Sequence, residues 1–155
     1  RDSSAVSSPV AEHALVDPIR RPDPARDGWR WWRWLAVIGY MGVLFFLSAQ
    51  STLPHLPGAP SDKLEHFTAY GVLSWLVVWA VAAGRWRSVT CRTVVIAILI
   101  SSAYGYSDEY HQSFVPDRSY DLMDWAADTS GAALAAALAW AWSILLRGRS
   151  RIHGV

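Results

Sequence analysis

Four apolar stretches divide the chain, at residues 34–49, 67–83, 93–106 and 125–146. A membrane-spanning helix needs about 20 predominantly apolar residues, with a range of about 17–25. The second and fourth stretches meet this length unaided, whereas the first and third reach it only with flanking residues. The pattern therefore predicts an all-α polytopic membrane helix bundle with four transmembrane helices, of which the third has the weakest signal.

Basic residues lie on alternate sides of these stretches. Short loops rich in Lys and Arg are retained on the cytoplasmic side. The connections at 50–66 and 107–124 hold one such base each, Lys63 and Arg118. Both termini are therefore predicted to be cytoplasmic, and these two loops, which carry the candidate chemistry, extracytoplasmic. The bases on the cytoplasmic side are Arg20, Arg21, Arg26, Arg30, Arg33, Arg85, Arg87, Arg92, Arg147, Arg149 and Arg151.

The polar flanks set the domain limits. Residues 1–28 are rich in Ser, Pro, Ala and charge without a helical or strand period, which predicts a disordered cytoplasmic leader. The transmembrane domain then covers 29–149, and 150–155 form a C-terminal tail. Cleavage of the first stretch as a signal peptide is the alternative, but Leu47 is larger than the residue that cleavage favours at that position. We expect the segment to remain as an anchor in the cell membrane.

The positions of the Trp residues and the single Cys limit the classes of binding partner and metal site that we expect. The chain has ten Trp, and those at the start of the first stretch are interleaved with Arg30 and Arg33, a pattern typical of anchoring in lipid headgroups. Nucleic-acid binding is the other interpretation of such a pattern, but the apolar run that follows at once excludes it from our expectations. The single cysteine, Cys91, excludes an intramolecular disulfide and any CxxC metal site.

Acidic and amide residues crowd the two extracytoplasmic ends, and carboxylates near a bilayer are costly enough to indicate a functional site. Spacings of three and four residues place them on shared helix faces. Two structural interpretations of these residues are the alternatives to a functional site. They are an ordinary capped helix start around residue 62 and a buried polar network that fixes helix register. Arg118 is the obvious cation to neutralise the acids. The candidate ligand-binding residues are Asp62, Lys63, His66, Tyr70, Gln112, Arg118, Asp121, Asp124 and Asp128.

Small residues continue the acidic stripe into the fourth stretch. Gly131 and Ala135 form a small-xxx-small pattern that lets a neighbouring helix approach closely. The alanines on the same helix offer a face for a second copy of the chain, so a homodimer is a possible assembly. That face consists of Ala132, Ala135, Ala136 and Ala139.

Residues 61–70, 104–121 and 124–131 carry a resemblance to the VanZ-like family of small bacterial membrane proteins. The pattern of that family reads Asp-Lys-x-x-His-Phe-x-x-Tyr, Asp-Glu-x-x-Gln-x-Phe, an Arg soon after a Pro, an Asp, and Asn-x-x-Gly. Two positions depart from it, since Asp117 stands where Gly is usual and Asp128 where Asn is usual. The resemblance implies a cell-envelope location and an association with lowered susceptibility to teicoplanin, a lipid-bearing glycopeptide.

The function that we favour from the sequence is a binding factor. Its polar pocket would hold an envelope lipid, a lipid-linked wall precursor or a glycopeptide, with Arg118, Lys63 and His66 taking a phosphate or carboxylate and Gln112 and Tyr70 donating hydrogen bonds.

An enzyme acting on a lipid-linked or phosphate-bearing substrate is the alternative, with Asp108 and Glu109 as acid and base and His66 as proton shuttle. A divalent ion held by acids of this end would serve the same reaction. The sequence nevertheless assigns no metal site, because no ligand spacing is specific, and no cofactor. A proton relay ranks third. The acids considered for the ion are Asp108, Glu109, Asp124 and Asp128.

Overall fold

The computed structural model of the protein describes residues 31–50 and 62–152, with side chains described as far as Arg149. The predicted leader at 1–28 and the Pro-rich part of the first loop lie outside the described residues. The same is true of the helix cap predicted at Ser61.

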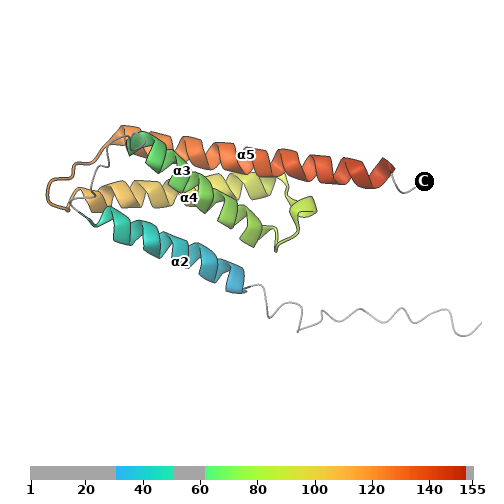
Figure 1. Cartoon of the computed structure of the whole chain (residues 1–155), viewed down its shortest axis with the longest axis horizontal. Coiled ribbons are helices and arrows are strands. Elements are labelled where there is room, and N and C mark those ends of the chain that lie inside the picture. Colours follow the sequence, from blue (N-terminus) through green and yellow to red (C-terminus); the bar gives the residue numbers. More distant parts are fainter. Residues whose placement is uncertain (1–30, 51–61, 153–155) are drawn as a thin grey trace, which may run out of the picture.

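Four α-helices and one short 3₁₀-helix make up this part of the chain (Figure 1). They are α2 (Trp31–Ser48), α3 (Asp62–Val81), η1 (Trp86–Ser88), α4 (Cys91–Gln112) and α5 (Leu122–Ile152). The described residues contain no strand, so the all-α prediction is confirmed. Helices α3, α4 and α5 form the centre of the bundle, and α2 packs mainly against α3 (Figure 1).

Three helices are long and apolar enough to cross a membrane, namely α2, α3 and the part of α5 between Leu122 and Arg149. Helix α4 has a sufficient length of 22 residues, but it is more polar because its inner face carries Ser101, Asp108 and Glu109. By length and composition, the described chain is thus a multi-pass membrane protein with three clear spans. The same polar face gave the third apolar stretch its weak signal in the sequence.

Helix α4 is longer at its carboxyl end than the sequence pattern predicted. It starts at a capping box formed by Thr90 and Thr93 and ends at Gln112, whereas a loop was expected from residue 107. The apolar pattern ends at Tyr106, but the helix continues because the polar residues of its last turns remain buried against neighbouring helices. The connection to α5 is consequently short and spans residues 113–121.

Close contact between α3 and α5 depends on Gly131. A Cβ atom at Gly131 would overlap the backbone carbonyl of Phe67, and Gly71 faces the same crossing. The predicted approach of a neighbouring helix at this small-residue pattern is confirmed. The alanine face proposed for a homodimer is wrong, however, because three of its members are buried inside the single chain. Ala132, Ala136 and Ala139 have no exposed surface.

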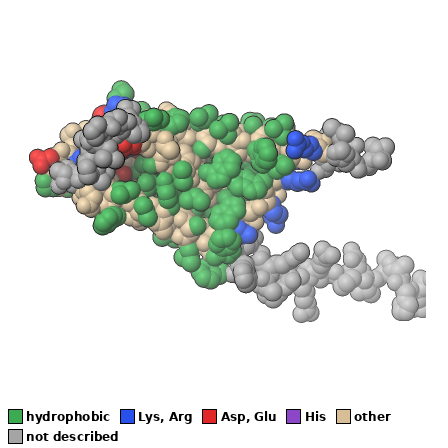
Figure 2. Space-filling model, viewed as in Figure 1, with side chains coloured by type: hydrophobic (Ala, Val, Ile, Leu, Met, Phe, Trp, Pro, Cys, Tyr) green, Lys and Arg blue, Asp and Glu red, His purple; other side chains and the backbone are tan. Residues whose placement is uncertain are grey.

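The two ends of the bundle differ in charge. Figure 2 shows the visible acidic side chains at one end, most of the visible basic ones at the other, and apolar side chains along the length between them. At the basic end Arg33 lies over the rings of Trp32 and Trp79, at 5.4 and 5.7 Å from their centroids. Trp140 and Trp142 of α5 are exposed. Aromatic rings with basic side chains are typical of a membrane interface.

Candidate functional site

The acidic end of the bundle collects the residues that the sequence singled out. Consecutive long helices run in alternating directions (Figure 1), so the end of α4 meets the starts of α3 and α5. Residues 62–70, 108–112 and 121–128 come together there although up to about sixty positions separate them in the chain. Four carboxyl groups of this end are buried, those of Asp108, Glu109, Asp124 and Asp128.

Asp108 has two side-chain partners. Its carboxylate accepts a hydrogen bond of 2.6 Å from Ser48 Oγ and one of 3.1 Å from the hydroxyl of Tyr70. Ser48 was not among the sequence candidates, although its signal was present. It lies four residues after Leu44 on the buried face of α2, where a polar side chain in an apolar helix needs a partner. Asp108 therefore joins α2, α3 and α4.

Lys63 holds the two acids at the start of α5. Its Nζ lies 2.8 Å from Asp121 Oδ2 and 2.6 Å from Asp124 Oδ1. The Lys63 ammonium, together with the Met123 backbone amide, holds the pKa of Asp121 below its usual range. The sequence had assigned neutralisation of the acids to Arg118. Among the described residues, Lys63 makes these ion pairs.

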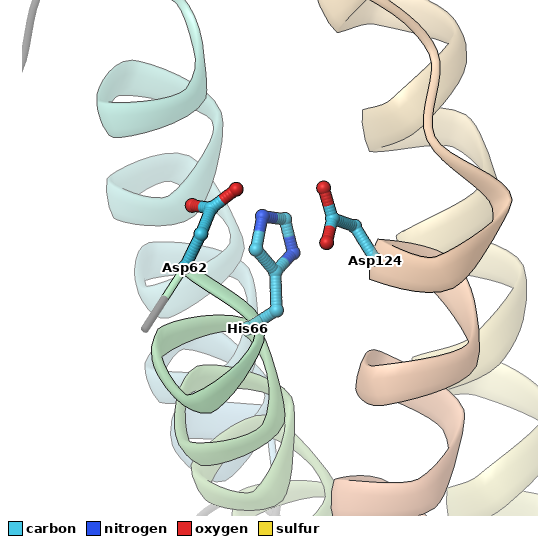
Figure 3. Close-up of side chains that lie close together, drawn as sticks. All are labelled: Asp62, His66 and Asp124. Carbon is cyan, nitrogen blue, oxygen red and sulfur yellow. The ribbon is translucent and has the colours of Figure 1, made fainter. Parts of the chain in front are cut away.

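His66 stands between several carboxyl groups. Its Nδ1 lies 3.0 Å from Asp128 Oδ1. On the outer side, the His66 ring lies between the carboxyl groups of Asp62 and Asp124 (Figure 3). Two sets of potential metal ligands share this imidazole, and in each set one ligand atom per residue lies within 4.8 Å of the others. We name them the inner trio, His66, Glu109 and Asp128, and the outer trio, Asp62, His66 and Asp124.

The carboxyl groups of the inner trio are incompletely paired. Glu109 Oε2 accepts a hydrogen bond of 2.9 Å from the backbone amide of Asp121. Glu109 Oε1 and Asp128 Oδ2 are buried and have no hydrogen-bond partner among the described residues. An unsatisfied buried polar atom costs about 1–3 kcal/mol, and more when it carries charge. Sequence reasoning identified both residues, but only the fold shows that they lie together.

A pocket of about 120 Å³ opens beside these groups, between α2, α3 and the end of α4. One wall is apolar and comes mainly from Leu44 and Leu47 of α2. The polar lining consists of Ser48, Asp62, Glu65, His66, Tyr70, Asp108, Gln112 and Arg118. Seven of these eight polar residues come from α3, α4 and the connection after α4, so the pocket has one apolar and one polar side.

The turn after α4 brings Arg118 to the pocket. Asp117 has a φ of 63°, in the left-handed region that favours glycine and that Asp and Asn tolerate better than most residues. This conformation accounts for the substitution noted in the sequence, where Asp117 replaces a usual Gly. The departure thus keeps the turn that precedes the pocket arginine.

The fold and the site define a class, a multi-pass helical membrane protein with a polar site at one end of its bundle. The chain belongs to the VanZ/LLP1 family, whose model matches residues 45–146. The match covers the ends of α3, α4 and α5 that form the acidic site, together with the last residues of α2. The family expected from the sequence motifs is confirmed.

One curated relative is an uncharacterized protein, C11E3.10, of the fission yeast Schizosaccharomyces pombe. It is 32% identical to this chain over 95 residues, which cover 60% of this chain and 56% of the relative. The chain thus spans just over half the length of that relative. No solved structure matches the chain.

Proposed function

We propose that this protein binds the headgroup of a membrane lipid or of a lipid-linked envelope precursor in the pocket at the acidic end. The two-sided lining of the pocket carries the proposal. Leu44 and Leu47 offer an apolar side to an acyl or isoprenoid chain, while Arg118 and its neighbours offer a polar side to the headgroup. The pocket volume of about 120 Å³ is below the roughly 300–1,000 Å³ of drug-sized sites, which favours a headgroup over a whole glycopeptide.

The charges in the lining favour a headgroup that contains both a phosphate and an amine. Arg118 presents a guanidinium, which binds phosphate through paired hydrogen bonds. Asp62 and Glu65 are exposed carboxylates of the same lining, suited to an ammonium group. Lys63 and Tyr70 were also expected to contact the ligand, but both already donate to carboxylates of the site. Arg118 is therefore the principal phosphate ligand in this proposal.

We further propose that all four helices cross the membrane, with both termini cytoplasmic and the pocket extracytoplasmic. At 1.5 Å per residue, the 22 residues of α4 extend about 33 Å, which matches a hydrocarbon core of about 30 Å. Its charged carboxyl end faces the bundle interior and the pocket. The positive-inside rule supports the orientation, because Arg85, Arg87 and Arg92 lie at the end opposite the pocket.

Cysteine labelling tests this orientation. Cys91, at the basic end, is exposed and is the single cysteine of the chain. In intact cells, we expect a membrane-impermeant maleimide to leave Cys91 unlabelled until the membrane is permeabilised. Ser113→Cys in a Cys91→Ser background places the thiol at the exposed acidic end, where it should react without permeabilisation. Labelling in the reverse order would show that the topology is the opposite of the one proposed.

Loss of Arg118 should weaken headgroup binding. Arg118→Ala removes charged hydrogen bonds worth about 1.5–3 kcal/mol, which corresponds to a roughly 10- to 150-fold increase in Kd. The measurement is native mass spectrometry of the purified protein titrated with phosphatidylethanolamine, phosphatidylglycerol and phosphatidylcholine. Phosphatidylethanolamine should bind most tightly to the unmodified chain, because it alone carries both a phosphate and a primary amine.

The matched control is Arg87→Ala, an exposed arginine at the opposite end of the bundle, which should leave lipid binding unchanged. If both variants bind lipid like the unmodified protein, the pocket is not a headgroup site.

Buried carboxylates beside His66 also favour the enzyme alternative. A product of new mass during incubation, formed by the unmodified chain and absent with Glu109→Gln, would establish that alternative.

The family resemblance extends the proposal to glycopeptide resistance. A protein that binds headgroups or lipid-linked wall precursors at the outer face would alter the surface that lipid-bearing teicoplanin meets. In this proposal, the contribution to resistance is indirect, since the pocket is too small for the antibiotic itself. The contribution to resistance would therefore require Arg118, as headgroup binding does.

A further inference from the structure

We infer that the inner trio, His66, Glu109 and Asp128, is a binding site for a divalent transition-metal cation. The three residues come from three different helices and offer ligand atoms within 4.8 Å of one another. This inference does not depend on headgroup binding, because the pocket lining and the inner trio share only His66. Its ligand set also differs from that of the ion considered from the sequence, which included Asp108 and Asp124 and lacked His66.

The observation that points to a ligand is the pair of unsatisfied oxygens. The side chains of Glu109 and Asp128 are fully buried, at 0% exposure. Glu109 Oε1 and Asp128 Oδ2 have no hydrogen-bond partner within the described chain. By contrast, Asp108 is held by two hydroxyl groups and Asp124 by Lys63. Among the four buried acids, the buried oxygens without a hydrogen-bond partner therefore belong to the two acids that lie beside His66.

Charge balance at the inner trio favours a divalent ion. In the deprotonated state that metal binding requires, the two carboxylates and the neutral imidazole together carry a charge of −2 in a water-poor environment, where isolated charge is strongly disfavoured. A divalent cation bound to these groups brings the sum to zero. Lys63 is not available for this role, because it is already bonded to Asp121 and Asp124.

The ligand types identify the class of metal. Imidazole nitrogen suits Zn²⁺, Fe²⁺ and similar ions, while carboxylate oxygen also suits Mn²⁺. One imidazole with two carboxylates therefore fits Mn²⁺ or Zn²⁺ better than Ca²⁺ or Mg²⁺, which prefer all-oxygen sites. Three protein ligands leave coordination positions open for water or a ligand oxygen. His66 also lines the pocket, so the pocket is the route by which an ion would reach the trio.

The outer trio provides a comparison within the same protein. It shares His66 (Figure 3), but Asp62 is exposed, and Asp124 Oδ1 lies 2.6 Å from Lys63 Nζ. Neither acid needs an ion, because water solvates Asp62, and Lys63 pairs with Asp124. Asp62→Asn is therefore a matched control, since it removes one carboxylate beside the same histidine but none of the three inner ligands.

The test is cation binding to the full chain, purified in detergent and stripped with EDTA. Mn²⁺ binding is followed by electron paramagnetic resonance and Zn²⁺ binding by calorimetry. We expect one ion per chain, and a rise in thermal midpoint when it binds. Glu109→Gln should weaken binding by at least about tenfold, the lower end of what loss of even an outer-shell partner costs. Asp128→Asn should act similarly, and Asp62→Asn should leave affinity unchanged.

Glu109→Gln keeps the side-chain shape and its acceptor for the Asp121 amide, so folding can be verified by the thermal midpoint without metal. The inference is overturned if the unmodified chain binds neither Mn²⁺ nor Zn²⁺. It is also overturned if Glu109→Gln and Asp128→Asn still bind while Asp62→Asn does not, because the outer trio would then be the site. These measurements use no lipid ligand, so their failure is separate from failure of the headgroup proposal.

Discussion

Gly131→Ala should destabilise the bundle by roughly 3 kcal/mol, at the upper end of the cost of overpacking. A Cβ at this position would overlap the carbonyl of Phe67, and backbone atoms cannot move aside as a flexible side chain can. The helical preference of Ala over Gly, worth about 1 kcal/mol, acts in the opposite direction and does not cancel the clash. The measurement is the free energy of unfolding in mixed micelles titrated with a denaturing detergent.

Gly148→Ala is the matched control on the same helix. A Cβ there has no neighbour within 4 Å, so the variant should be unchanged or more stable by about 0.5–1 kcal/mol. Equal behaviour of the two variants would contradict the tight α3–α5 crossing. Gly131 lies three residues after Asp128, so the displaced helix should also move that carboxylate away from His66 and weaken any cation binding.

Hydrophobic patterning was sufficient to predict the helices and the end of the bundle where the candidate site residues gather. Four apolar stretches correspond to α2, α3, α4 and α5, and the alternating direction of the helices brings residues 62–70 to residues 108–128. It was less reliable for the end of α4. A hydropathy pattern records the average polarity of a segment, whereas buried Asp108, Glu109 and Gln112 keep the helix intact by facing the interior.

Individual pairings could not be predicted, because they depend on how each helix is rotated. The sequence pattern singled out Arg118 as the cation that neutralises the acids, yet the structure pairs Lys63 with Asp121 and Asp124 and leaves Arg118 at the pocket. Rotation also determines the environment of small residues. The alanines of α5 formed a plausible dimer face by spacing, but α5 turns that face toward the centre of its own bundle, where Ala132 and Ala136 are fully buried.

Asp128→Asn should stabilise the chain in chelator, and saturating metal should reduce or reverse that advantage. In chelator, we expect the variant to be more stable than the unmodified chain by about 1–3 kcal/mol, the cost of one buried unsatisfied polar group. The Asn oxygen can still accept from His66 Nδ1, now 3.0 Å from Asp128 Oδ1. Asn also places no charge at the buried position where Asp128 Oδ2 has no partner among the described residues. Mn²⁺ or Zn²⁺ at concentrations that saturate the unmodified chain should stabilise that chain more than the variant.

The effect of metal on the stability difference between the two chains distinguishes a cation site from a proton site. If a proton neutralises the inner trio, Asp128→Asn changes stability by the same amount in chelator and in metal. If a cation does so, binding at 100 times the Kd of the unmodified chain adds about 2.7 kcal/mol to that chain and at most about 1.4 kcal/mol to a variant that binds at least tenfold more weakly, so the advantage of the variant falls by at least about 1.3 kcal/mol. Asn is the residue usual at this position in the VanZ-like pattern. The aspartate of this chain would then be a local change that adds a metal ligand to a bundle able to fold without it.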